Sequence, residues 1–145
     1  LGYNFRMTDV HAAIGLTQLS KLERFNQTRG ANAGFLTAQL QDAVRCPIVR
    51  PGMRHVFHQY TVRVHERRDT IQEKLRAAGV ESAIYYPIPI HKQGQYRGLG
   101  YGQESYPVTE AACDQVLSLP VHPGLSQVDL ETIISAVRDS VAVSP

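Results

Sequence analysis

The stretch from Thr8 to Val44 limits the fold most, because it predicts one long helix. Thr8 suits the N-cap position, and Asp9 in the first turn suits the helix dipole. Gly30 and Gly34 weaken the middle of this helix by roughly 1 kcal/mol each relative to alanine. A helix of about 50 Å would extend beyond a small domain, so we expect it to pack on something else as well. An apolar stripe at three- and four-residue steps supports the helix: Ala12, Leu16, Leu19, Leu22 and Phe25.

Short strands and helices are predicted after the long helix. Residues 56–64 alternate between apolar and polar side chains, which indicates a half-buried strand. Asp69 begins a short helix, with Gln72 three residues later as in a capping box, and Gly79 ends it. Residues 80–86 predict a second strand, which ends at a proline because proline cannot donate to a sheet.

The last third of the chain predicts a loop, two helices and a short extended piece. Residues 94–106 are rich in glycine and tyrosine and predict a loop, followed by a helix over residues 107–117. Residues 119–121 are extended, and Ser126 with Asp129 caps a final amphipathic helix. Two or three short strands cannot bury themselves. We therefore expect an α+β fold, in which a small two-to-three-stranded sheet has helices packed on one face.

Composition excludes several classes of protein. The 145 residues, 43% of them hydrophobic and 19% charged, suit one ordinary globular domain. A net charge of +2 gives no reason to expect nucleic acid as a partner. No apolar run approaches the roughly 20 residues of a membrane span, so no membrane association is expected. Cys46 and Cys113 lie far apart, which favours free thiols in the cytoplasm.

The sequence offers no conventional catalytic or metal motif. His55 and His58 are three residues apart on a predicted strand, which places them on opposite faces, and no Cys/His cluster supplies further ligands. A G-x-S-x-G nucleophile motif is absent. Residues 98–102 resemble a phosphate-binding glycine loop only loosely, and a flexible surface loop explains them better. We predict no metal site.

The segment from Tyr85 to His91 has side chains suited to a ligand. It places two phenols and an imidazole around two prolines, Pro87 and Pro89. Prolines fix the direction of a segment and lower its entropy, as a substrate-lining loop needs. The alternative is that the tyrosines fill the edge of the core and His91 caps the next turn.

A second candidate is the polar segment of residues 1–9, which leads into the long helix. The N-terminus of a helix is a natural place to meet a phosphate. Asn4 could donate an amide hydrogen there, and Arg6 could donate a forked pair. The alternative is that Arg6 pairs with Asp9 or another acid.

Five segments resemble motifs of the DegT/DnrJ/EryC1/StrS sugar-aminotransferase family. Residues 2–26, GYNFRMTDVHAAIGLTQLSKLERFN, are similar to the family signature GYNxRMTDxQAAIGxxQLxKLxxF in order and spacing. Later segments resemble the HxxHQYxxR strand, the RDxxxxxLxxxGI helix, the IHYPxPLH loop and the LSLPxxP segment. They lie in the family order at residues 55–63, 69–79, 85–91 and 117–123.

The resemblance implies a carboxy-terminal fragment of a fold-type I enzyme that depends on pyridoxal 5'-phosphate. The opening at Leu1 rather than methionine also leads us to expect a fragment. Such enzymes transfer an amino group, usually from glutamate, to a nucleotide-linked keto-sugar, and work as homodimers with shared active sites. Residues 1–45 would then link from the missing large cofactor-binding domain, and residues 46–145 would form the small domain. A sugar dehydratase of the same family and a non-catalytic regulatory module are the alternatives.

The resemblance also implies that this chain lacks the lysine that holds the cofactor. Its three lysines, Lys21, Lys74 and Lys92, all lie outside the family context of that residue. The fragment alone is therefore expected to be inactive, with no catalytic residue of its own.

What the resemblance leaves to this chain is an accessory share of the active site. Asn4 falls on the asparagine that reaches the cofactor phosphate, typically from the neighbouring subunit, and Arg6 lies beside it. Tyr86 and His91 fall on the loop that closes over the sugar side of the partner's site. Tyr85 replaces the histidine usual in IHYP, which alters hydrogen bonding beside the substrate.

Overall fold

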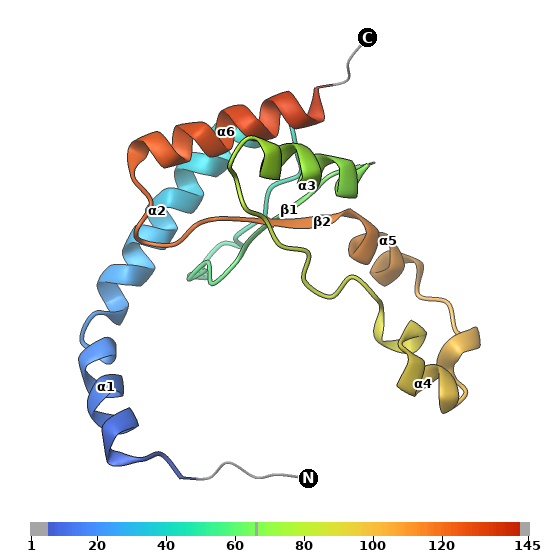
Figure 1. The fold of residues 1–145 in the computed structure, drawn as a ribbon, viewed down its shortest axis with the longest axis horizontal. Coiled ribbons are helices and arrows are strands. Elements are labelled where there is room, and N and C mark those ends of the chain that lie inside the picture. The colour runs from blue at the N-terminus through green and yellow to red at the C-terminus, as the bar shows by residue number, and fades with distance from the viewer. Residues whose placement is uncertain (1–5, 66, 143–145) are drawn as a thin grey trace.

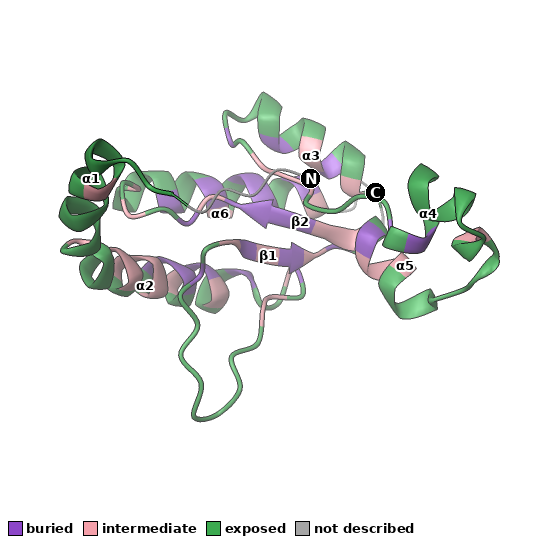
Figure 2. Cartoon of the chain, turned by 90° about the horizontal axis from the view of Figure 1, so that it is seen from below, coloured by how far each residue is buried: buried purple, intermediate pink, exposed green. Residues whose placement is uncertain are grey.

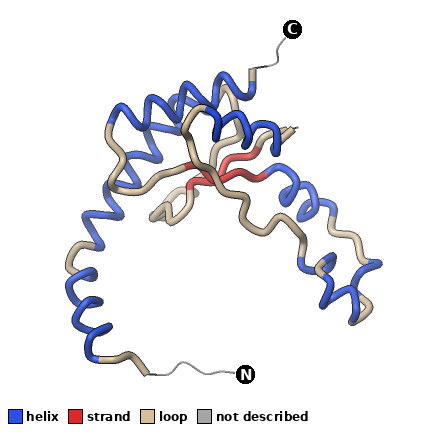
Figure 3. Tube along the Cα trace, in the orientation of Figure 1, coloured by secondary structure: helices blue, strands red, loops and turns tan. Residues whose placement is uncertain are grey.

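Helices pack against a two-stranded antiparallel sheet in the computed structural model, which describes residues 6–65 and 67–142 (Figures 1 and 3). The elements follow one another as α1 (Asp9–Leu19), α2 (Leu22–Leu40), β1 (Tyr60–Arg63), α3 (Arg68–Ala77), α4 (Gly94–Gly98), α5 (Pro107–Gln115), β2 (Val116–Leu119) and α6 (Gln127–Val141). Short 3-10 turns cover Ile90–Lys92 and Tyr101–Gln103. The predicted α+β class is confirmed.

The sheet is formed by β1 and β2, with Tyr60 opposite Leu119. The hydroxyls of Thr61 and Ser118 lie 2.7 Å apart across it. Two predictions here are wrong. Residues 80–86 form only a single bridge, from Ala83 to Ser118, and β2 begins where the helix of residues 107–117 was expected to continue. Burial of the β2 side chains against β1 outweighs the local helical pattern.

The core lies between the sheet and the helices α2, α3 and α6, which Figure 1 shows on one side of the strands. Figure 2 shows the buried positions facing inward from these elements. The largest side chains with almost no exposure are Tyr60, Leu36, Leu40, Leu75, Leu117, Val62 and Val137. Burying a side chain of this size stabilises a fold by roughly 1.5–3 kcal/mol. The second half of α2 therefore shares its core with the residues that follow it.

The predicted long helix is divided in two at Ser20 and Lys21. The Ser20 hydroxyl donates to the carbonyl of Thr17 at 2.8 Å, a local bond that competes with the helical pattern. Helix α2 runs through Gly30 and Gly34 without a break, and their predicted cost in stability stays a prediction. Thr8 caps α1 as predicted, its hydroxyl accepting the His11 N–H.

Strand β1 begins four residues later than expected. Phe57 has a φ of 47°, in the left-handed region, and its N–H donates to Nδ1 of His55 at 2.9 Å. This local turn interrupts the predicted strand near its start, and Val56 stays exposed. The alternation is correct beyond it, since Tyr60, Val62 and Val64 are all buried.

Helix α3 also begins differently from the prediction. The N-cap is Arg67, with a φ of 56° and no side-chain cap, instead of Asp69. Gln72 donates to the carbonyl of Ser82 at 3.0 Å and so connects α3 to the following segment. The end of the helix is confirmed, because Gly79 has a φ of 78°.

Two parts of the chain extend away from the core, α1 at one end and the segment around α4 at the other (Figure 1). None of the α1 side chains is buried. Residues 94–106 include α4 and a 3-10 turn, which corrects the prediction of a plain loop. The capping box of Ser126 and Asp129 at the start of α6 is confirmed. Among the described residues, no helix has both the length and the apolar character that a membrane crossing needs.

Candidate functional site

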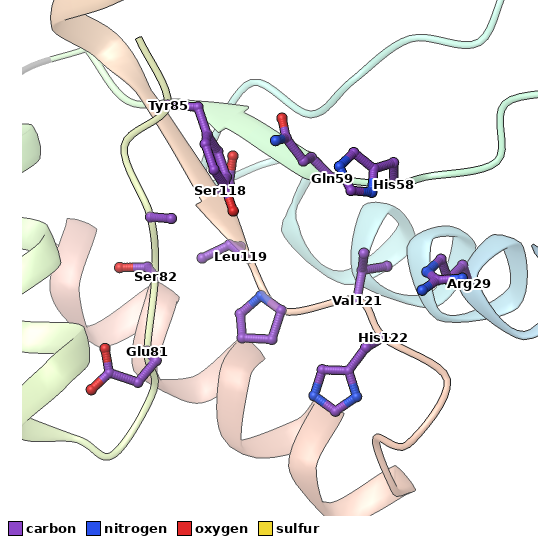
Figure 4. Close-up of a pocket in the computed structure, with 12 residues that line it drawn as sticks. Arg29, His58, Gln59, Glu81, Ser82, Tyr85, Ser118, Leu119, Val121 and His122 are labelled. Atoms are coloured by element: carbon purple, nitrogen blue, oxygen red, sulfur yellow. The ribbon is translucent and has the colours of Figure 1, made fainter. Parts of the chain in front are cut away.

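An open cleft of about 490 Å³ lies beside β2, lined by polar side chains from several segments. Figure 4 shows Arg29, His58, Gln59 and Tyr85 projecting around it. Arg29 comes from α2, while His58 and Gln59 directly precede β1. In Figure 4 the Glu81 carboxylate points away from this group. Guanidinium, imidazole, amide and phenol groups suit a ligand rich in hydroxyls or negative charge.

The rim of this cleft is held in place by Asn32, a buried residue of α2. Its amide donates to the carbonyl of His122 at 3.1 Å. The His122 ring in turn accepts the Gly124 N–H at Nδ1, at 3.2 Å. A neutral His122 that accepts this bond carries its ring proton on Nε2.

The segment from Tyr85 to His91 leads from the cleft to the projecting part of the chain around α4 (Figure 1). Tyr85 lines the cleft and is 45% exposed. Tyr86 is 78% exposed and has a φ of 59°, so its ring is directed outward by a left-handed backbone turn. Non-glycine residues in this region are strained, and such strain clusters at functional sites.

His91, at the end of this segment, is only 7% exposed. Its Nε2 lies 3.1 Å from Oε1 of Glu110 on α5, and its ring packs edge-on against Tyr106 at 5.0 Å. The structure therefore gives His91 the role of an anchor that attaches the segment to α5. Its direct contact with substrate stays a prediction, as do those of Tyr85 and Tyr86.

Glu110 is the residue that the sequence reasoning missed. Besides His91, it binds Lys92 Nζ at 2.5 Å and accepts the N–H of Tyr106 at 2.9 Å. These bonds, the one from Lys92 above all, lower the pKa of Glu110 to about 2. The sequence could have shown that Glu110 is an acid in the first turn of the helix that begins at Pro107. It contains no local pattern that connects Glu110 to His91.

A hollow of about 510 Å³ lies in the projecting part of the chain, against the anchor. Its walls are largely aromatic, with Tyr96, Tyr101 and Tyr106 beside His91. The Tyr106 hydroxyl donates to Glu104, which raises the pKa of this phenol. The hollow can hold a flat or ring-shaped group.

The N-terminal candidates lie apart from this region. Asn4 is outside the described residues. Arg6 is exposed, and within the described part of the chain it forms no ion pair with Asp9. In Figure 1, α1 and the segment that leads from the sheet to α4 extend from the core on different sides. One chain therefore does not bring the two candidate groups together.

The histidines of the HxxH pattern have separate surroundings. His55 packs against the ring of Phe57 at 4.3 Å, and His58 lines the cleft. Among residues 6–65 and 67–142, no three His, Cys, Asp or Glu side chains lie close enough to hold a metal ion.

The comparisons with known proteins identify the family. The DegT/DnrJ/EryC1/StrS aminotransferase family matches residues 1–138. The chain belongs to this family. Among its relatives within the DegT family are the pleiotropic regulatory protein of Geobacillus stearothermophilus and the UDP-N-acetyl-3-dehydro-alpha-D-glucosamine 3-aminotransferase of Acidithiobacillus ferrooxidans. The first is 35% identical over 143 residues, which are 96% of this chain and 38% of the relative. The second is 35% identical over 139 residues, which are 95% of this chain and 37% of the relative.

The fold matches the corresponding part of solved DegT-family structures. S. venezuelae DesV, crystallised with a ketimine intermediate, has a TM-score of 0.91 at 32% identity, over 99% of this chain and 39% of its own. A DegT-family aminotransferase from Brucella abortus has a TM-score of 0.86 at 33% identity. The match covers 98% of this chain and 38% of the Brucella chain. The chain thus spans under two-fifths of the length of these relatives.

Proposed function

We propose that this chain is the carboxy-terminal part of an aminotransferase that transfers an amino group from glutamate to a nucleotide-linked keto-sugar. The observation that carries the proposal is the match to DesV over 99% of this chain. Relatives named as transaminases of UDP- and dTDP-linked amino sugars support the substrate class. The rest of the enzyme would come from the part that these relatives have beyond this chain.

The residues present fit one part of pyridoxal 5'-phosphate. Arg6 is exposed just before the N-terminus of α1, a position that favours a phosphate group. The amine of Lys92 is engaged by Glu110, and Lys74 Nζ lies 3.5 Å from the carbonyl oxygen of Ser140, between α3 and α6. We therefore propose that Arg6, with Asn4, holds the cofactor phosphate and that a lysine outside this chain holds its aldehyde carbon. When bound, the cofactor supplies an electron sink.

Substrate binding is assigned to the segment from Tyr85 to His91 in this proposal. Tyr85 and Tyr86 would contact the sugar, while His91 is fixed by Glu110 and sets the position of both. Because α1, which follows Arg6, and this segment extend from the core on different sides in Figure 1, both would serve an active site shared between two subunits of a homodimer. The phenol and imidazole groups would donate to hydroxyl and phosphate oxygens of the sugar nucleotide.

The alternative of a regulatory module has one observation in its favour, the name of the Geobacillus relative.

An experiment on the full-length protein separates the alternatives. The protein is incubated with pyridoxal phosphate, ¹⁵N-glutamate and a panel of UDP- and dTDP-linked keto-sugars, and the products are analysed by mass spectrometry. Amino transfer gives a ¹⁵N-labelled sugar, and a dehydratase gives a sugar that has lost a hydroxyl without gaining nitrogen. An unchanged panel together with an unchanged cofactor spectrum would favour the regulatory reading.

A further inference from the structure

A third hollow, of about 230 Å³, lies between α3, α6 and the end of β1. It shares no lining residue with the cleft or with the aromatic hollow. Figures 1 and 2 show α3 and α6 together on the side of the sheet that carries the core. The polar side chains around the hollow are Arg63, His65, Arg67, Thr70, Lys74 and Ser140.

Two arginines, a lysine and a histidine line this small hollow, and none of its lining residues among 6–65 and 67–142 carries a carboxylate. Arg63 donates through Nε and Nη2 to the side-chain oxygen of Gln115, at 3.2 and 2.6 Å. Lys74 Nζ lies 3.5 Å from the carbonyl oxygen of Ser140. Both partners are neutral, so they satisfy hydrogen bonds but leave the positive charge in place.

Two acids near the hollow, both within the described part of the chain, pair with other cations. Asp69, in the first turn of α3, binds Arg68 at 2.9 Å. Asp42 binds Arg138 of α6 at 2.7 Å. Across residues 6–65 and 67–142, no salt bridge joins a carboxylate to Arg63, Arg67 or Lys74. Positive charges held around one hollow make its electrostatic potential more positive. Binding of an anion there is therefore favourable.

We propose that this hollow binds a phosphate group, either as free phosphate or as part of a phosphate monoester. A dianion matches several converging cations better than a single carboxylate does. Arginine provides forked donors for phosphate oxygens, lysine adds a point charge, and the Thr70 hydroxyl adds a further donor. The site would be separate from the cofactor phosphate proposed at Arg6, because the two lie on different elements.

The test uses the full-length protein saturated with pyridoxal phosphate. The melting temperature is measured in inorganic phosphate, in glycerol phosphate and in sodium chloride of equal ionic strength. The site variant is R67Q/K74Q, and the matched control is Arg76→Gln, which removes one charge from the same helix α3 outside the hollow. Isothermal titration with inorganic phosphate then gives the affinity of each variant.

We expect phosphate to raise the melting temperature of the unaltered protein and of Arg76→Gln, and chloride to have no such effect. In R67Q/K74Q the rise should disappear and the affinity should fall at least about tenfold. A larger effect of inorganic phosphate than of glycerol phosphate identifies the free ion as the ligand, and the reverse identifies a monoester. A rise that survives in R67Q/K74Q, or that is equal in chloride, overturns the proposal. Should the double variant not fold, Lys74→Gln alone carries the test.

Discussion

Oε1 of Glu110 lies 3.1 Å from Nε2 of His91, and this contact joins the candidate substrate segment to α5. The same carboxylate holds Lys92 at 2.5 Å and the backbone N–H of Tyr106 at 2.9 Å. One glutamate thus fixes both ends of the projecting part of the chain that contains α4. The side chains that would reach the sugar are positioned from outside their own segment.

Replacing Glu110 with glutamine should loosen the projecting part and leave the core intact. A neutral amide binds Lys92 and His91 more weakly than a carboxylate does, because charge-assisted bonds are roughly twice as strong. Limited proteolysis should then cut residues 93–106 several times faster, while α2 and α6 stay protected. Glu131→Gln is the control, since this residue bonds only to Gln127 among the described side chains. Equal cleavage of both variants would contradict the anchoring role.

Acid should release the same contact over a defined range of pH. The pKa of Glu110 is lowered from 4.5 to about 2, so its contribution to stability is present above 4.5 and is lost as the pH falls towards 2. NMR signals of the Tyr106 ring should therefore shift as the pH falls towards 2, before those of buried Leu75. In Glu110→Gln this step should be missing. A Tyr106 shift that persists in the variant would assign the titration to another group.

Two of the three predicted caps are confirmed, those whose side chains bond to partners three residues away, whereas the cap predicted at Asp69 is wrong. Ser126 with Asp129, and Thr8 before α1, needed only local spacing. The contact of Glu110 with His91 joins residues 19 apart, and it depends on how α5 packs, which no local pattern encodes.

Strand β2 also depends on a contact between residues far apart in the sequence, which local patterns do not predict. Its helical context suggested that the helix from Pro107 would continue, and only pairing with β1, more than 50 residues earlier, selects the strand. Phe57 and Arg67 were missed for a different reason. Both adopt a positive φ, which sequence reasoning expects from glycine.

Ser126→Ala should reduce the stability of the chain by about 1 kcal/mol, because the N3 amide of α6 loses its capping acceptor. Urea unfolding followed by circular dichroism measures the difference. Ser135→Ala, within the same helix, should change stability by less than about 0.5 kcal/mol. If both substitutions cost the same, the cap is not what stabilises the start of α6.

Tyr86→Phe should lower kcat/KM for the sugar nucleotide by about tenfold in the full-length enzyme, because the lost hydroxyl leaves a substrate group unpaired. The ring and the backbone turn should remain, so stability should not change. Steady-state kinetics with the keto-sugar and with glutamate separate the two half-reactions. The control is Val108→Ala, because this α5 side chain is exposed. Loss confined to the glutamate half-reaction would argue against a sugar contact.

The chain alone should form no stable adduct with pyridoxal phosphate at a single lysine. Lys92 is held by Glu110, and neither Lys21 nor Lys74 lines the cleft beside β2. Borohydride reduction followed by peptide mapping measures the labelling of each lysine. Stoichiometric modification of one of them would show that this chain carries the cofactor lysine.

The break at Ser20 and Lys21 has a consequence for how the chain opens. Since α1 buries none of its side chains, its unfolding breaks no core contact, whereas opening α2 disrupts Leu36 and Leu40. Amide hydrogens of residues 9–19 should therefore exchange with solvent almost as fast as in a free peptide, and those of residues 32–40 only when the whole core opens. Slow exchange in α1 of the full-length enzyme would report directly on the surface that covers it.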